Sequence, residues 1–70
     1  NYREANETST KKDFLFRMRI CRKEAKETIY WLQLITEANN ELDSKTRPLI
    51  DETIQLVKIF ASIIVNSEPK

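Results

Sequence analysis

The chain of 70 residues lacks glycine and histidine altogether, and it contains one cysteine and two prolines. A lone Cys21 cannot form a disulfide within the chain, and without histidine the usual ligands of a zinc site are missing. A nucleophilic cysteine would need a basic partner such as histidine, and the sequence has no phosphate-binding loop and no dinucleotide fingerprint. We therefore expect a protein that is not an enzyme, with no cofactor, no metal and no small-molecule substrate.

Long hydrophobic runs are also missing. The longest one, from Ile59 to Val65, is far too short for a transmembrane helix, and it contains Ser62. No stretch has the pattern of a secretory signal, and a single unpaired thiol suits a reducing compartment. These absences predict a cytoplasmic protein without a membrane segment.

The small size of the chain limits its core. A domain of this length buries only about 60% of the surface that its unfolded chain exposes. Such domains are usually stabilised by disulfides, metals or partner subunits. Because the composition disfavours the first two, we expect a homo-oligomer.

Most of the sequence shows the hydrophobic period of α-helices and has few residues that would interrupt them. We expect one domain over residues 1–70, with a helix end over about 1–7, a long helix over about 11–39 and a last helix over about 46–65. Thr8, Ser9 and Thr10 are expected to separate the first two, because Thr10 with Asp13 resembles a capping box.

The connection between the long helix and the last helix is short. Asn39 and Asn40 are expected to end the long helix in the left-handed conformation. Pro48 favours a late start of the last helix, since proline fits best in a first turn. Short connections imply antiparallel neighbours. The predicted fold is all-α: an antiparallel, up-down four-helix bundle, with the first helix and the start of the second missing from this chain.

Apolar residues of the long helix recur at alternating steps of four and three, which predicts a core seam. Its members are Phe14, Met18, Cys21, Ala25, Thr28, Leu32 and Ile35. The last helix carries two such seams side by side, one through Leu49, Thr53, Leu56, Phe60 and Ile63 and one through Ile50, Ile54, Val57, Ala61 and Ile64. So wide an apolar surface needs several neighbouring helices. The residues expected at an oligomer interface are Phe16, Trp31, Leu34, Ile59 and Ile63.

Four blocks of the sequence, NYREANE, KKDF, KEAKETIYWLQLI and LVKIFASII, occur in the order and spacing of a known family. With them the chain resembles the four-helix bundle proteins also called 23S rRNA intervening-sequence proteins. This resemblance implies a bacterial, cytoplasmic, antiparallel four-helix bundle that assembles into a homopentamer. The family has no settled biochemical role, and a related, more basic branch serves as accessory proteins to reverse transcriptases.

A basic stripe on the long helix is the best candidate for a binding site. Basic side chains along one helix face can follow the phosphates of a nucleic acid, and an aromatic ring beside them can stack on a base. The alternative is a solvated helix face, which is the commoner explanation of charge runs. The candidate residues are Lys12, Arg19, Arg22, Lys23, Lys26 and Tyr30.

Glu24 falls inside the apolar arc of the long helix on a helical wheel. A carboxylate there needs a partner, because a lone buried charge is costly. We expect a structural salt bridge in which Arg3, on the preceding helix, joins Glu24 and Glu27. The alternative is a catalytic carboxylate pair formed by Glu24 and Glu27, three residues apart on one face.

Taken together, the sequence predicts a non-enzymatic, oligomeric helical-bundle protein that acts as a scaffold or adaptor. The alternative function is binding of RNA or DNA through the basic helix face. The resemblance extends this alternative to a role as an accessory to a reverse transcriptase or to a ribosomal RNA element.

Overall fold

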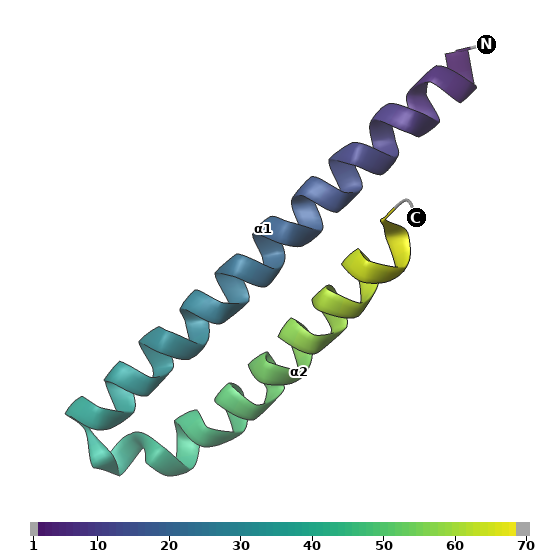
Figure 1. Cartoon of the computed structure of the whole chain (residues 1–70). Helices are drawn as coiled ribbons and strands as arrows, with labels where there is room; N and C mark the ends of the chain where they lie inside the picture. The colour runs from purple at the N-terminus through teal and green to yellow at the C-terminus, as the bar shows by residue number, and fades with distance from the viewer. Residues whose placement is uncertain (1, 69–70) are drawn as a thin grey trace.

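The chain folds into a helical hairpin (Figure 1). The computed structural model describes residues 2–68, and their side chains from Thr10 onward. Helix α1 (Tyr2–Ala38) is followed by a short 3-10 helix, η1 (Asn40–Leu42), and by helix α2 (Asp43–Ser67), which runs antiparallel to α1. Because residues 2–68 contain helices and no strand, the predicted all-α class is confirmed. These residues form two helices, so the bundle of four stays a prediction.

The first helix is continuous where a break was predicted. Thr8, Ser9 and Thr10 lie inside α1, and Thr10 is therefore not a helix cap. Serine and threonine lower the stability of a helix interior by only a few tenths of a kcal/mol per residue, and no glycine or proline is present to interrupt the backbone. The separate helix over about 1–7 and the capping box were wrong.

The turn between the helices also differs from the prediction. Asn39 ends α1 with φ −146° and ψ 88°, and no described residue has a positive φ. The backbone N–H of Asn39 donates to the carbonyl oxygens of Ile35 and Thr36 at 3.0 and 3.2 Å. The N–H of Leu42 then donates to the carbonyl of Asn39 at 3.0 Å. A single 3-10 turn thus reverses the chain without the left-handed residue that was expected.

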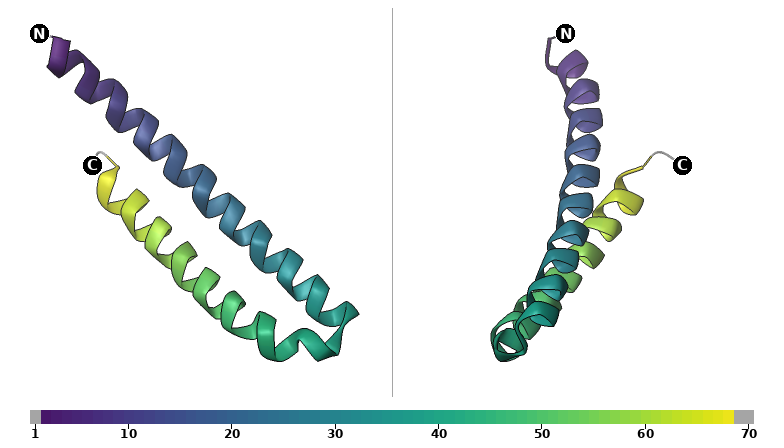
Figure 2. Two further views of the ribbon diagram at one scale, coloured as in Figure 1. Left: turned by 180° about the vertical axis from the view of Figure 1, so that it is seen from behind. Right: turned by 90° about the vertical axis from the view of Figure 1, so that its left-hand side faces the viewer.

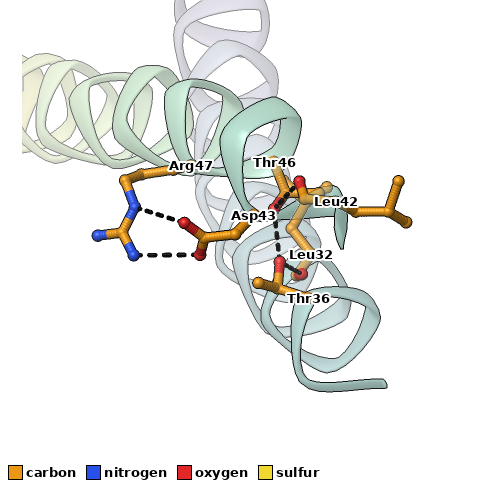
Figure 3. Close-up of polar contacts among 6 residues, drawn as sticks. All are labelled: Leu32, Thr36, Leu42, Asp43, Thr46 and Arg47. Carbon is orange, nitrogen blue, oxygen red and sulfur yellow. Dashed lines mark hydrogen bonds and ion pairs between the residues drawn. The ribbon is translucent and has the colours of Figure 1, made fainter. Parts of the chain in front are cut away.

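Helix α2 begins at Asp43, earlier than Pro48 suggested, so Pro48 lies in the second turn. Its missing N–H removes the hydrogen bond to the carbonyl of Ser44. The carboxylate of Asp43 does not cap the helix. It accepts two hydrogen bonds from the guanidinium of Arg47, at 3.1 and 3.2 Å (Figure 3). This two-point contact one turn into α2 stabilises the start of the helix locally.

A pair of threonines joins the helices beside the turn (Figure 3). The hydroxyl oxygens of Thr36 and Thr46 are 2.5 Å apart, and they lie 2.8 and 3.0 Å from the carbonyl oxygens of Leu32 and Leu42 respectively. Two hydroxyl hydrogens serve these three contacts, so one threonine donates to the other while the second donates to its own helix. Thr46 is 6% exposed, which makes this the most buried polar group of the hairpin.

The helices pack along one seam that repeats every seven residues, in steps of three and four, as in a coiled coil. Every residue at these positions is buried or half-buried. The seam residues of α1 are Leu15, Met18, Arg22, Ala25, Ile29, Leu32 and Thr36. Those of α2 are Thr46, Ile50, Thr53, Val57, Phe60, Ile64 and Ser67. Among the apolar side chains described, only Leu15, Ala25 and Ile64 are buried, and the other seam residues are half-buried or, like Thr46, polar.

The seam differs in part from the predicted one. Met18, Ala25 and Leu32 lie in it as expected, whereas Phe14, Thr28 and Ile35 are exposed. In α2 the seam combines members of both predicted seams and leaves Leu49 and Leu56 exposed. The helices also diverge with distance from the turn (Figure 2). The hairpin is therefore a thin structure, 58 × 18 × 15 Å, without an enclosed core.

The hydrogen bond between the two threonines can be tested by substitution. Replacing Thr46 with valine removes the interhelical bond and leaves Thr36 bound to its own helix. We expect the free energy of unfolding to fall by about 1 kcal/mol, measured by urea denaturation at a fixed protein concentration. Thr53→Val is the matched control, because Thr53 is also a seam residue of α2 and its hydroxyl bonds only to the carbonyl of Leu49 in its own helix. Equal effects of the two substitutions would contradict an interhelical contribution.

Candidate nucleic-acid interface

The seam defines the two sides of the hairpin. In heptad notation the seam residues are a and d, and positions e and g flank them. Because α1 and α2 are antiparallel and pack through positions a and d, the e positions of both helices lie on one side of the hairpin and the g positions on the other. Arg19, at position e of α1, forms an ion pair 3.2 Å long with Glu68, the residue that follows the end of α2. These two sides have different chemistry.

The e side of α1 carries the predicted basic residues. A shallow hollow of about 370 Å³ lies there, lined by Arg19, Arg22, Lys23, Lys26, Glu27 and Tyr30. Five of the six residues proposed from the sequence thus come together. Lys12, also at position e and exposed, lies two turns nearer the N-terminus and does not line the hollow. We call Arg19, Arg22, Lys23, Lys26 and Tyr30 the basic surface.

Arg22 is unlike the other cations, because it occupies an a position in the seam and is half-buried. The Thr36–Thr46 and Arg19–Glu68 contacts place about residues 60–65 of α2 beside it. That stretch, FASIIV, contains no charged residue. Arg22 makes no ion pair with any carboxylate in the described part of the chain. Half-buried at its seam position, Arg22 also lines the hollow.

The remaining groups of the basic surface are solvent-exposed. Within residues 10–68, Lys23 and Lys26 also have no ion-pair partner, whereas Arg19 is held by Glu68. Tyr30 is 56% exposed, and its ring meets that of Trp31 edge-to-face, with centroids 5.4 Å apart. The surface therefore offers three unpaired cations in a row that ends at an aromatic ring.

The other described arginines with ion pairs lie away from the hollow. A hydrogen bond to Asp13, 2.8 Å long, raises the pKa of Arg17 above its ordinary value. The hydrogen bonds to Asp43 likewise raise the pKa of Arg47. Arginine is protonated at any physiological pH, so these pairs alter no charge state. They do neutralise positive charge locally, whereas Arg22, Lys23 and Lys26 around the hollow have no ion-pair partner within residues 10–68, although the acidic Glu27 also lines it.

The salt bridge predicted from Arg3 to Glu24 and Glu27 does not fit a single hairpin. Arg3 lies on the same continuous helix as Glu24, 21 residues away, or about 31 Å along the axis. The side chain of Arg3 is outside those described. Glu24 is exposed instead of buried, so its charge needs no partner, and neither glutamate forms an ion pair within residues 10–68. A pairing between chains stays a prediction.

The g side is mostly apolar on both helices. At position g it presents Phe14, Cys21, Thr28 and Ile35 from α1 and Leu49, Leu56 and Ile63 from α2, with Trp31 and Ile59 at the adjoining c positions. We call this set the apolar face. Phe14, Trp31, Ile35, Leu49, Leu56 and Ile59 are all more than 40% exposed.

The residues predicted for an oligomer interface divide between the apolar face and other parts of α1. Trp31, Ile59 and Ile63 belong to the apolar face. Phe16 and Leu34 are also exposed, but Phe16, at position b, adjoins the e side, and Leu34, at position f, lies on the back of α1. The sequence pattern assigned Phe14, Ile35, Leu49 and Leu56 to the internal seam. A residue one place before an a position and a true seam residue differ by only about 100° around the helix, and the pattern did not separate them.

The described residues were also searched for a metal site and for a membrane-spanning helix. No cluster of three or more metal-ligating side chains occurs among the described residues. Neither described helix combines the length and the apolar character that crossing a bilayer requires.

We compared the chain with known protein families, curated proteins and solved structures. No family model, no curated protein and no solved structure matches the chain.

Proposed function

We propose that the chain is a non-enzymatic, self-associating helical-bundle protein that acts as a scaffold or adaptor. The observation that carries the proposal is the apolar face, which is left uncovered while only three of the described apolar residues are buried. Monomeric proteins rarely expose a large contiguous apolar surface. A two-helix chain with so little burial gains stability by covering this face.

The size of the apolar face suits a second copy of the chain as its occupant. The paired part of α1, from Leu15 to Ala38, is about 36 Å long, and the hairpin is 18 Å wide. As a flat rectangle the face measures roughly 650 Å², and the relief of the side chains adds to this. A standard protein interface takes about 800 Å² from each partner. Two hairpins joined by their apolar faces would form a four-helix bundle.

The family resemblance also supports self-association, because the 23S rRNA intervening-sequence proteins are four-helix bundles that form homopentamers. It implies five subunits, a different assembly from the pairing of two hairpins, and in this reading the hairpin supplies two helices of one bundle. The assembly would be bacterial and cytoplasmic, and the unpaired Cys21 suits that compartment.

Binding of RNA or DNA through the basic surface is the second candidate function. Arg22 favours it, because an unpaired arginine in a helix seam weakens packing and is explained by a ligand that neutralises it. The same surface would serve an accessory to a reverse transcriptase or to a ribosomal RNA element, as the resemblance implies.

Self-association through the apolar face can be tested at Leu56. Burial of a leucine contributes about 1.5–3 kcal/mol, so Leu56→Glu should weaken association at least tenfold. Light scattering at micromolar concentration should show an oligomer for the unmodified chain and a smaller species for the variant. Helicity by circular dichroism should fall as well, and the thiol of Cys21 should react faster with a thiol reagent.

Gln55→Glu is the matched control for this experiment, since it adds the same charge at the neighbouring f position, which points away from the seam. It should leave the oligomer intact. A folded monomer of the unmodified chain at micromolar concentration would contradict the proposal.

Nucleic-acid binding can be tested by reversing charges on the basic surface. If about four phosphates are contacted, the affinity for a single strand should fall about 50-fold between 50 and 200 mM salt. Arg19→Glu with Lys26→Glu should abolish binding in fluorescence anisotropy. Arg17→Glu with Lys45→Glu reverses the same charge at c positions on the other side and should preserve binding, with light scattering used to verify that the oligomer beside these positions is unchanged. Similar losses in both double variants would show that only net charge matters.

A further inference from the structure

The basic surface combines unpaired cations with the exposed ring of Tyr30, and single-stranded and double-stranded nucleic acids would contact these two features differently. Its unpaired cations, Arg22, Lys23 and Lys26, can contact phosphates of any strand. The ring of Tyr30 can stack only on a base whose face is accessible, which means a single strand or an unpaired end. We propose that the basic surface binds single-stranded nucleic acid, with phosphates in the hollow and one base stacked on Tyr30. This inference rests on the second candidate function.

The arrangement of the cations supports a short strand lying along α1. Arg19 and Tyr30 are 11 residues apart, which is about 16 Å along the helix. That length accommodates roughly five nucleotides at the 3.4 Å spacing of a stacked strand. Arg22 is the half-buried member of this row, at a seam position, whereas Lys23 and Lys26 are exposed.

The position of Tyr30 distinguishes this surface from a simple charged patch. Tyr30 and Phe16 both occupy b positions of α1, and they are 56% and 60% exposed. Only Tyr30 lines the hollow with the cations. Its edge-to-face contact with Trp31 restricts the rotation of the ring, so less conformational freedom is lost when a base stacks on it. An acidic peptide would use the cations without needing this ring.

The test measures fluorescence anisotropy of the full chain with three labelled probes: a 12-nucleotide oligo-uridylate, a 12-base-pair RNA duplex and a poly-glutamate peptide of matched charge. We expect the single strand to bind most tightly. Tyr30→Ala should weaken single-strand binding roughly 5- to 150-fold and leave duplex binding within twofold. Tyr30→Phe, which keeps the ring, should restore the affinity for the single strand.

Two controls make the result specific to the hollow. Phe16→Ala removes an equally exposed ring from another b position and should not change binding. Arg22→Gln should lower the slope of log affinity against log salt by about 0.7, the contribution of one phosphate contact on a single strand, whereas Arg17→Gln should not. Circular dichroism of each variant verifies that the hairpin is intact.

The three probes distinguish a single-strand site from nucleic-acid binding in general. Equal binding of single strand and duplex, or an unchanged affinity in Tyr30→Ala, overturns the single-strand site while nucleic-acid binding stands. Binding of poly-glutamate as tight as that of the oligonucleotide overturns it in favour of an acidic protein partner. No binding of either nucleic acid overturns both.

Discussion

The packing of α1 against α2 along a single seam is the constraint on which the rest of the structure depends. The seam sets which residues flank it, and it thereby gives the hairpin an apolar side and a basic side. Shifting the seam by one residue around α1 would bury Phe14 and Ile35 and move Arg19 and Lys26 away from α2. The Thr36–Thr46 contact near the turn and the Arg19–Glu68 pair near the other end both form with the observed seam.

The helical class and the antiparallel connection could be predicted from the sequence, because long stretches without glycine or proline show a helical period. The seam could be predicted only in part. Helix α1 has two adjacent apolar rows, and the one that packs within the chain includes the polar Arg22 and Thr36. A pattern read from hydrophobicity therefore favours the other row, with Phe14 and Ile35. Only the position of α2 decides between them.

The ends of the helices were predicted least well, since weak local preferences are overridden by continuity and packing. Thr8 to Thr10 offered a cap that the backbone does not use, and Pro48 is accepted inside α2 at the loss of one hydrogen bond. The grouping of the basic residues around the hollow could be anticipated, because they lie on one helix and their relative positions follow from helical spacing alone; their role in binding stays a prediction. What the sequence could not reveal is that Arg22 lies in the seam with no carboxylate beside it on α2.

The unequal length of the two helices has a consequence for how the chain folds. Helix α1 has 37 residues and α2 has 25, so α1 extends past the end of α2 by about 18 Å (Figure 1). An isolated helix of that length would be unstable in water, chiefly because its first turn is costly to form. Here the paired part of α1 already provides that nucleus. Each residue of the extension is added to an existing helix, so only the free energy of helix propagation applies and no new nucleus is needed. The helix content of the extension therefore depends on the hairpin having formed first.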